Sequence, residues 1–75
     1  MEKIIEILNG LKSGIDFQNA KELITGKVLD SIEFISLIES LEDEFDIEIG
    51  IEYMENSNFD SVEAIWKMVQ ELKKE

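Results

Sequence analysis

The chain has 75 residues and a mass of 8.7 kDa, which is enough for one small domain, and we assign residues 1–75 to it. Its 18 acidic residues outnumber 7 lysine and arginine residues, so the net charge is −11. This charge argues against nucleic-acid binding, which requires a basic surface, and against docking on an anionic membrane. At 44% hydrophobic residues, the chain is also too apolar for a disordered acidic tail.

The excess negative charge lies in the central half of the chain. Residues 28–66 contain no lysine or arginine, whereas twelve acidic residues fall there. The remaining residues carry six acids and seven lysines, so they are close to neutral. Any partner attracted by this charge would meet it on the central segment.

Cysteine and histidine are both absent, which removes disulfides, thiol chemistry and the commonest general base. The acids at 43–48 are dense but lack the spacing and central glycine of an EF-hand, so we expect no dedicated metal site. The chain has neither a signal-peptide pattern nor an apolar stretch long enough to span a bilayer. We therefore expect no membrane insertion and a cytoplasmic location.

The first apolar stripe predicts a helix over residues 2–12. Its apolar residues recur at helical spacing, and they are Ile4, Ile5, Leu8 and Leu11. Gly10, Ser13 and Gly14 then mark a stop. Residues 15–29 lack clean periodicity and predict a long loop, with room for a helical turn at 20–24. Such long loops often carry function.

The second stripe is the clearest and predicts a helix over residues 31–44. Its apolar positions are Ile35, Ile38, Leu41 and Phe45, flanked by Phe34 and Leu37. Asp46 ends the pattern, and the alternation over 47–52 predicts an extended loop because no second strand signal exists to pair with it. A helical turn near 52–56 and a polar turn at 56–58 follow.

The last stripe predicts a helix that begins at Asp60 or Ser61. Its apolar side is formed by Val62, Ile65, Trp66, Val69 and Leu72, and lysines fall in its second half, where they complement the helix dipole. The predicted fold is all-α, a small bundle of three main helices plus one short helix. We expect the aromatic residues at 34, 45, 53 and 66 to lie in the core or at its edge.

An Asp-Ser-x-Glu string opens each of the two later helices, at residues 30–33 and 60–63. In most proteins such a string is a capping box, in which the aspartate accepts from the N3 amide and the glutamate accepts from the cap amide. We assign this capping role to both copies and no other role to Ser61. The surroundings of the first copy point to a further role for Ser31.

The sequence around the first copy is GKVLDSIEFISLI at residues 26–38, followed by LEDEFDIEI at 41–49. It resembles the acyl and peptidyl carrier proteins, which bear a 4′-phosphopantetheine arm. The likeness covers the Asp-Ser-Ile string, the apolar residue before it, the acidic helix behind it and the Glu-x-Glu-Phe exit. Chain length, helix order and the long first loop fit the same family, so the resemblance also implies an acyl-carrier-like bundle.

The resemblance implies a covalent 4′-phosphopantetheine on Ser31, transferred from coenzyme A by a phosphopantetheinyl transferase. Asp30 matches the aspartate that contributes to the magnesium site of that transferase. A serine at a helix N-terminus after a long loop is accessible, and the helix dipole there favours a phosphate. The negative charge of the adjacent Asp30 carboxylate would repel that phosphate unless a cation or the backbone amides offset it.

The resemblance also implies partner binding through Ile32, Glu33, Glu39 and Glu42. This helix lacks the Glu–Lys pairs that would stabilise it, and its uniformly negative face would speed association with basic patches on a partner. Implied partners are an acyl- or aminoacyl-activating ligase or transferase and synthases of fatty-acid, polyketide, peptide or cell-envelope biosynthesis. We expect a monomeric, non-catalytic carrier.

Three questions stay open at this point. Ser36 and Glu39 depart from many fatty-acid carriers, so the cargo could be acyl or aminoacyl. Phe34, Ile38, Ile65 and Trp66 are candidate linings for a sheltered cargo but could equally fill the core. The competing hypothesis for function is an unmodified acidic helical adaptor that binds a basic partner.

Overall fold

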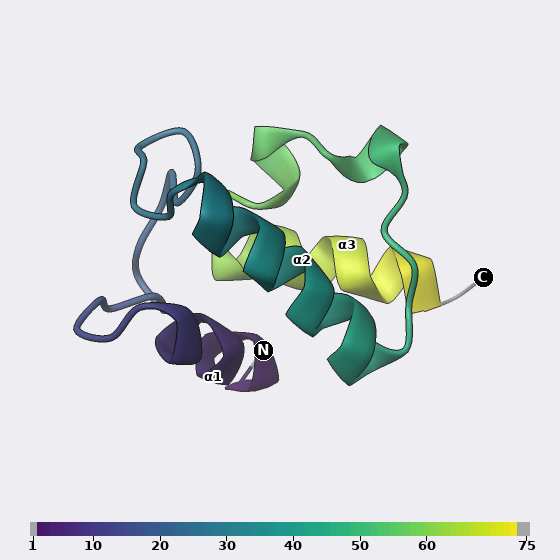
Figure 1. Ribbon diagram of the computed structural model, residues 1–75, viewed down its shortest axis with the longest axis horizontal. Coiled ribbons are helices and arrows are strands. Elements are labelled where there is room, and N and C mark those ends of the chain that lie inside the picture. The colour runs from purple at the N-terminus through teal and green to yellow at the C-terminus, as the bar shows by residue number, and fades with distance from the viewer. Residues whose placement is uncertain (1, 74–75) are drawn as a thin grey trace.

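Three α-helices form the fold, which a computed structural model describes for residues 2–73 (Figure 1). The helices are α1 (Glu2–Leu11), α2 (Ser31–Phe45) and α3 (Val62–Lys73), and two short 3-10 turns, η1 (Ile51–Tyr53) and η2 (Asn56–Asn58), precede α3. No β-strand occurs between residues 2 and 73. The predicted all-helical bundle is confirmed, with two short turns in place of one short helix.

Each of the three helices contacts the other two, so the core lies between them. In Figure 1, α2 crosses in front of α3 and α1 lies below both. The connection from α1 runs along one end of the bundle to the start of α2, and the segment carrying η1 and η2 returns along the top to α3. Ser31 therefore lies at the end of the bundle where the first long loop is.

The helix ends follow the local sequence. After α1, Gly14 adopts a left-handed backbone (φ +84°), which agrees with the predicted stop. At the end of α2, Asp46 is also left-handed (φ 53°, ψ 51°), and its N–H donates to the Glu42 carbonyl. Residues 47–50 form a loop without strand pairing, as predicted, but Ile51 and Glu52 belong to η1 and not to the extended loop predicted over 47–52.

Among residues 2–73, fourteen apolar side chains are buried and form the core, and most of them come from the predicted stripes. Two stripe positions were predicted incorrectly, because Ile35 is 57% exposed and Trp66 is 39% exposed. A helix turns about 100° per residue, so successive steps of three rotate the stripe away from its starting point. On α2 the buried side chains are Leu37, Ile38 and Leu41, and Ile35 lies outside their arc. On α3, Met68 is buried instead of Trp66.

Residues 12–30 contain no helix, so the helical turn considered at 20–24 is not formed. Hydrogen-bonded turns occur instead at 17–19 and 23–27. Phe17, Leu23 and Leu29 are buried in the common core, at regular intervals of six residues. These three side chains attach the loop to the bundle and bring its last residues to the start of α2.

Candidate functional site

Ser31 is the first residue of α2, and its side chain is exposed. Asp30 precedes it as the N-cap. The Asp30 Oδ1 accepts a 2.8 Å hydrogen bond from the Glu33 N–H, and the Glu33 Oε1 accepts one of 2.9 Å from the Asp30 N–H. The predicted capping box is confirmed here. It fixes the helix start that presents the serine hydroxyl.

The backbone at Ser31 also favours an anion. The first hydrogen bond of the helix runs from the Phe34 N–H to the Asp30 carbonyl, at 2.9 Å. The N–H groups of Ser31 and Ile32 precede it, so they have no acceptor within the helix. Such N–H groups, together with the helix dipole, stabilise a phosphate at this end.

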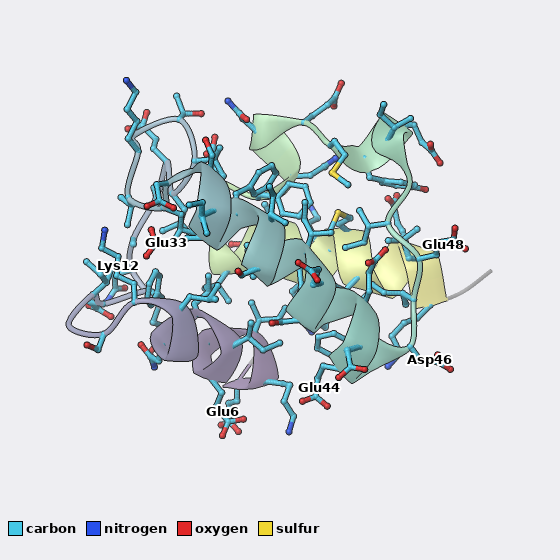
Figure 2. All side chains as sticks on the ribbon, viewed as in Figure 1. Glu6, Lys12, Glu33, Glu44, Asp46 and Glu48 are labelled. Atoms are coloured by element: carbon cyan, nitrogen blue, oxygen red, sulfur yellow. The ribbon has the colours of Figure 1, made fainter. Side chains whose placement is uncertain are left out.

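Lys12, just beyond α1, reaches the segment that leads into Ser31. Its Nζ donates a 3.0 Å hydrogen bond to the Val28 carbonyl and lies 4.0 Å from Glu33 Oε1 (Figure 2). One cation thus joins the end of α1, the approach to α2 and the capping box. No sequence signal pointed to this contact, because it pairs residues 16 and 21 positions apart.

The second Asp-Ser string behaves differently from the first. Ser61, not Asp60, caps α3, because its Oγ accepts a 3.1 Å hydrogen bond from the Ala64 N–H. The capping role assigned to Ser61 is confirmed, and the capping role of Asp60 was predicted incorrectly. The Asp60 carboxylate instead accepts three hydrogen bonds from the first loop: from the N–H of Ile24 (3.0 Å), the N–H of Thr25 (2.9 Å) and the Thr25 hydroxyl (2.8 Å).

These contacts determine the ionisation of Asp60. Partial burial raises the pKa of its carboxyl, but the hydrogen bonds from Thr25 and Ile24 outweigh burial and hold the pKa below its ordinary value of 3.8. The carboxylate is therefore charged at neutral pH and remains a strong acceptor. Together with the 2.9 Å bond from the Leu23 N–H to the Asp60 carbonyl, it clamps the first loop to the start of α3.

One side of α2 is exposed along most of its length, and we call it the outer face of α2. It comprises Ile32, Ile35, Glu39 and Asp43, at spacings of three, four and four. Ile32 is 76% exposed and Ile35 is 57% exposed, so two large apolar side chains face solvent next to Ser31. Surfaces that combine exposed apolar side chains with charge are typical of interaction sites.

The four residues predicted to bind partners are not equivalent. Ile32 and Glu39 are exposed on the outer face. Glu33 is engaged in the capping box and near Lys12, and the Glu42 Oε2 accepts a 2.9 Å hydrogen bond from the Ile49 N–H. Glu42 thus holds the exit from α2. Partner binding by all four stays a prediction.

A cavity of about 370 Å³ opens beside Ser31. Its lining residues are Ile24, Lys27, Leu29, Asp30, Ser31 and Phe34. Phe34 also packs edge-to-face on Phe59, with ring centroids 4.9 Å apart, which connects this cavity to the core. The volume is at the lower end of the range of about 300–1,000 Å³ typical of small-molecule sites.

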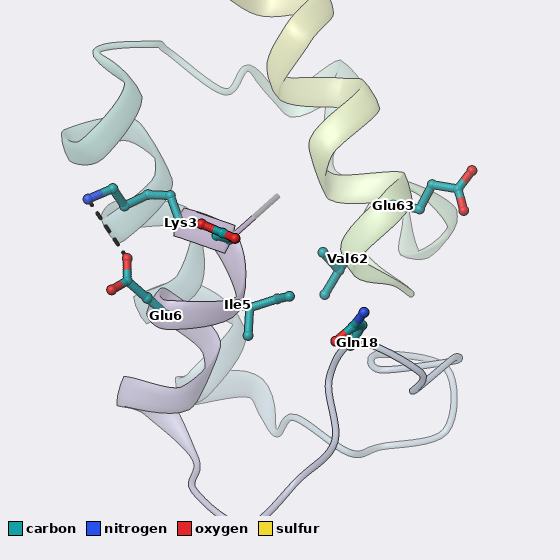
Figure 3. Close-up of a pocket in the computed structure, with 7 residues that line it drawn as sticks. Lys3, Ile5, Glu6, Gln18, Val62 and Glu63 are labelled. Atoms are coloured by element: carbon teal, nitrogen blue, oxygen red, sulfur yellow. Dashed lines mark ion pairs between the residues drawn. The ribbon is translucent and has the colours of Figure 1, made fainter.

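A larger cavity, of about 800 Å³, lies between the starts of α1 and α3 and shares no lining residue with the one beside Ser31. Ile5 and Val62 point toward each other there, and Lys3 and Glu6 form an ion pair at its edge (Figure 3). Its other lining side chains are mainly acidic and exposed. These side chains do not form a constellation of the kind found in catalytic sites.

Within residues 2–73, the acidic side chains nowhere gather into a group that could hold a metal ion. None of the helices described in that range is both long and apolar enough to cross a membrane. Models of known protein families, curated protein sequences and solved structures contain no significant match to this chain. The site at Ser31 is therefore the basis for its proposed function.

Proposed function

We propose that this protein is a carrier that holds an acyl or aminoacyl group on a 4′-phosphopantetheine arm attached to Ser31. The observation that carries the proposal is the placement of Ser31. It is an exposed hydroxyl at a capped helix start, next to an open cavity and at the head of the outer face of α2. The Asp-Ser-Ile string and the acidic helix resemble the carrier family at these same positions.

Attachment would proceed by attack of the Ser31 hydroxyl on the phosphorus of coenzyme A that bears the pantetheine. A new P–O bond to the serine forms, the bond to the adenosine-side phosphate breaks, and 3′,5′-adenosine diphosphate leaves. The serine proton passes to a base of the transferase. Asp30 uses one carboxylate oxygen in the capping box, and its other oxygen is available to a magnesium ion of that enzyme.

When bound, the arm supplies a thiol that forms thioesters, a group that this cysteine-free chain does not contain. The chain's own residues then act by presentation. The outer face of α2 combines negative charge with apolar side chains. Such a surface favours transient binding to basic patches of a ligase or synthase. Ile32 and Ile35 would supply apolar contact, and Glu39 and Asp43 the steering charge.

The test is an intact-mass measurement after incubation with coenzyme A, magnesium and a phosphopantetheinyl transferase of broad specificity. We expect a gain of one phosphopantetheinyl group. Ser31→Ala should abolish the gain. Two control variants should keep it: Ser36→Ala, which removes another serine of α2, and Ser61→Ala, which removes the serine of the second Asp-Ser string. Because Ser31 is exposed, circular dichroism should show that Ser31→Ala remains helical.

No mass gain with a transferase that modifies a known carrier in the same tube would overturn the proposal. In that case the outer face of α2 favours the second candidate, an unmodified acidic adaptor. Its exposed Ile32 and Ile35 among acidic residues would then bind a basic partner directly.

A further inference from the structure

The cavity beside Ser31 combines one cation with an apolar wall. Among the described residues, Lys27 is the only basic one that lines it, and Ile24, Leu29 and Phe34 provide the apolar side chains. Ser31 itself is on the lining, so a group attached to its oxygen would begin beside this cavity. None of these features belongs to the outer face of α2.

The loop holds Lys27 in place by its backbone. The Gly26 N–H donates to the Glu22 carbonyl at 2.7 Å and the Lys27 N–H donates to the Ile24 carbonyl at 3.0 Å. A Cβ at Gly26 would lie only 2.7 Å from the Glu22 carbonyl oxygen, so glycine is required for this tight turn. Lys27 is left-handed (φ 60°), a conformation that lysine rarely adopts and that often accompanies functional sites.

The Asp60 clamp secures the same turn from outside. Its three hydrogen bonds hold Ile24 and Thr25, directly before Gly26 and Lys27. The wall of the cavity that faces away from α2 is therefore fixed without any ligand. Such preorganisation lowers the cost of binding.

The charges around Ser31 leave a role for Lys27. A phosphodiester on Ser31 would place a second negative charge next to the Asp30 carboxylate. Lys12 already contacts the Val28 carbonyl and Glu33. Lys27 takes part in none of the ion pairs found within residues 2–73, and it is the last basic residue before the lysine-free segment 28–66.

We infer that the cavity binds the root of the phosphopantetheine arm, with the Lys27 ammonium pairing with the phosphodiester and the apolar wall contacting the adjacent dimethyl group. This inference rests on the proposed function. The match is chemical, because in phosphopantetheine a quaternary carbon bearing two methyl groups lies one carbon away from the phosphate ester. A cation beside an apolar wall is complementary to an anion beside that apolar group.

The experiment compares the apo and holo forms of four proteins: the wild type, Lys27→Gln, Lys27→Glu and the matched control Lys21→Glu. Lys21 is an exposed lysine of the same loop that does not line the cavity. Intact mass first establishes that each protein is modified. Melting temperature and amide chemical shifts are then recorded for both forms at low salt.

In the wild type and in Lys21→Glu, we expect modification to change the melting temperature little and to shift the amides of Ile24, Lys27 and Leu29. In Lys27→Glu the holo form should melt several degrees below its apo form, and the shifts should fall at least to about half of the wild-type value. Lys27→Gln should be intermediate. Glutamate and glutamine tolerate the left-handed backbone no worse than lysine, so the variants should fold.

The outcomes separate the two proposals. If the wild type gains no mass, the proposed function fails and this site fails with it. In the other outcome, all four proteins are modified while the differences in melting temperature and amide shifts between holo and apo forms are equal in Lys27→Glu and Lys21→Glu. That result overturns the site alone, because the arm then extends from Ser31 without contacting the cavity.

Discussion

Thr25 and Asp60 are thirty-five residues apart in the sequence, yet Thr25 donates two hydrogen bonds to the Asp60 carboxylate, from its N–H at 2.9 Å and its hydroxyl at 2.8 Å. With the Ile24 N–H on the same carboxylate, they join the first loop to the start of α3. Because Ser31 follows this loop by only a few residues, the clamp helps to define where Ser31 lies.

Replacing Asp60 by alanine should lower the free energy of unfolding by about 1–2 kcal/mol, since hydrogen bonds to a charged group contribute more than neutral ones but partial exposure weakens them. Thr25→Val removes only the hydroxyl donor and should cost about half as much. Urea unfolding followed by circular dichroism measures both effects.

The matched control is Glu63→Ala. Glu63 is exposed in the first turn of α3, so it shares the favourable interaction of Asp60 with the helix dipole but makes none of its loop contacts. An equal loss of stability in Glu63→Ala and Asp60→Ala would show that the dipole, not the clamp, accounts for the effect.

The clamp also predicts a pH dependence. Although partial burial acts in the opposite direction, the Thr25 and Ile24 hydrogen bonds lower the pKa of Asp60 below 3.8 in the folded chain. A carboxyl with a lowered folded-state pKa stabilises the fold fully above its unfolded pKa of about 3.9, and this contribution is lost as the pH falls through the folded-state pKa. The stability deficit of Asp60→Asn relative to the wild type should therefore be constant between about pH 7 and pH 5 and shrink below about pH 4.

Urea titrations at several pH values measure this difference directly. Taking the difference between two proteins cancels the titration of the other carboxylates, which both share. A deficit that stays the same down to about pH 2 would mean that the charge of Asp60 contributes nothing to the clamp.

The three helices could be predicted from the sequence because their signals are local. Apolar spacing, the Asp30–Glu33 capping box and the left-handed stop at Asp46 all depend on neighbours within one or two turns. The exposure of Ser31 follows from the same local pattern, since it is the residue after an N-cap. This part of the candidate site could therefore be predicted from the sequence.

The remainder of the site depends on contacts between distant residues. The strings at residues 30–33 and 60–63 are locally alike, yet only Asp30 caps its helix because Asp60 is occupied by a loop that folds onto it. The cavity beside Ser31 combines that loop with α2. No periodic pattern in the sequence encodes either arrangement.

Burial of the loop side chains gives a third prediction. Leu23 is 0% exposed, and its removal by Leu23→Ala should destabilise the chain by about 2–5 kcal/mol. Ile35→Ala removes the same number of carbon atoms from an isomeric side chain that is 57% exposed, and should change stability by no more than about 0.5 kcal/mol.

Thermal unfolding of the two variants at one pH makes the comparison. The loss in Leu23→Ala could approach the whole stability of so small a domain, so Leu23→Val provides a milder variant that should remain folded. A smaller loss of stability for Leu23→Ala than for Ile35→Ala would contradict the burial of Leu23. It would also place Ile35 in the core, as the helical spacing had predicted.

The excess charge of the central segment gives the last prediction. Within residues 2–73 the structure contains three ion pairs, Lys3–Glu6, Lys3–Glu44 and Lys12–Glu33, and all three involve well-exposed lysines. Most of the twelve acids in residues 28–66 therefore repel one another. In Figure 2, Glu44 and Asp46 lie near the end of α2 opposite Glu33, and Glu48 lies on the segment that follows.

Adding salt should raise the melting temperature, because screening weakens this repulsion. At about 0.01 M salt the Debye length is about 30 Å, comparable with the 34 × 22 × 20 Å dimensions of the fold, whereas at about 1 M it is about 3 Å. Asp43 and Glu48 are both exposed acids and offer a matched test. Asp43→Asn combined with Glu48→Gln removes two of these charges without removing a buried side chain. The double variant should melt higher than the wild type at low salt and gain less from added sodium chloride. A melting temperature that is insensitive to salt, or equal gains in both proteins, would mean that the negative charges cost the folded chain no more than the unfolded one.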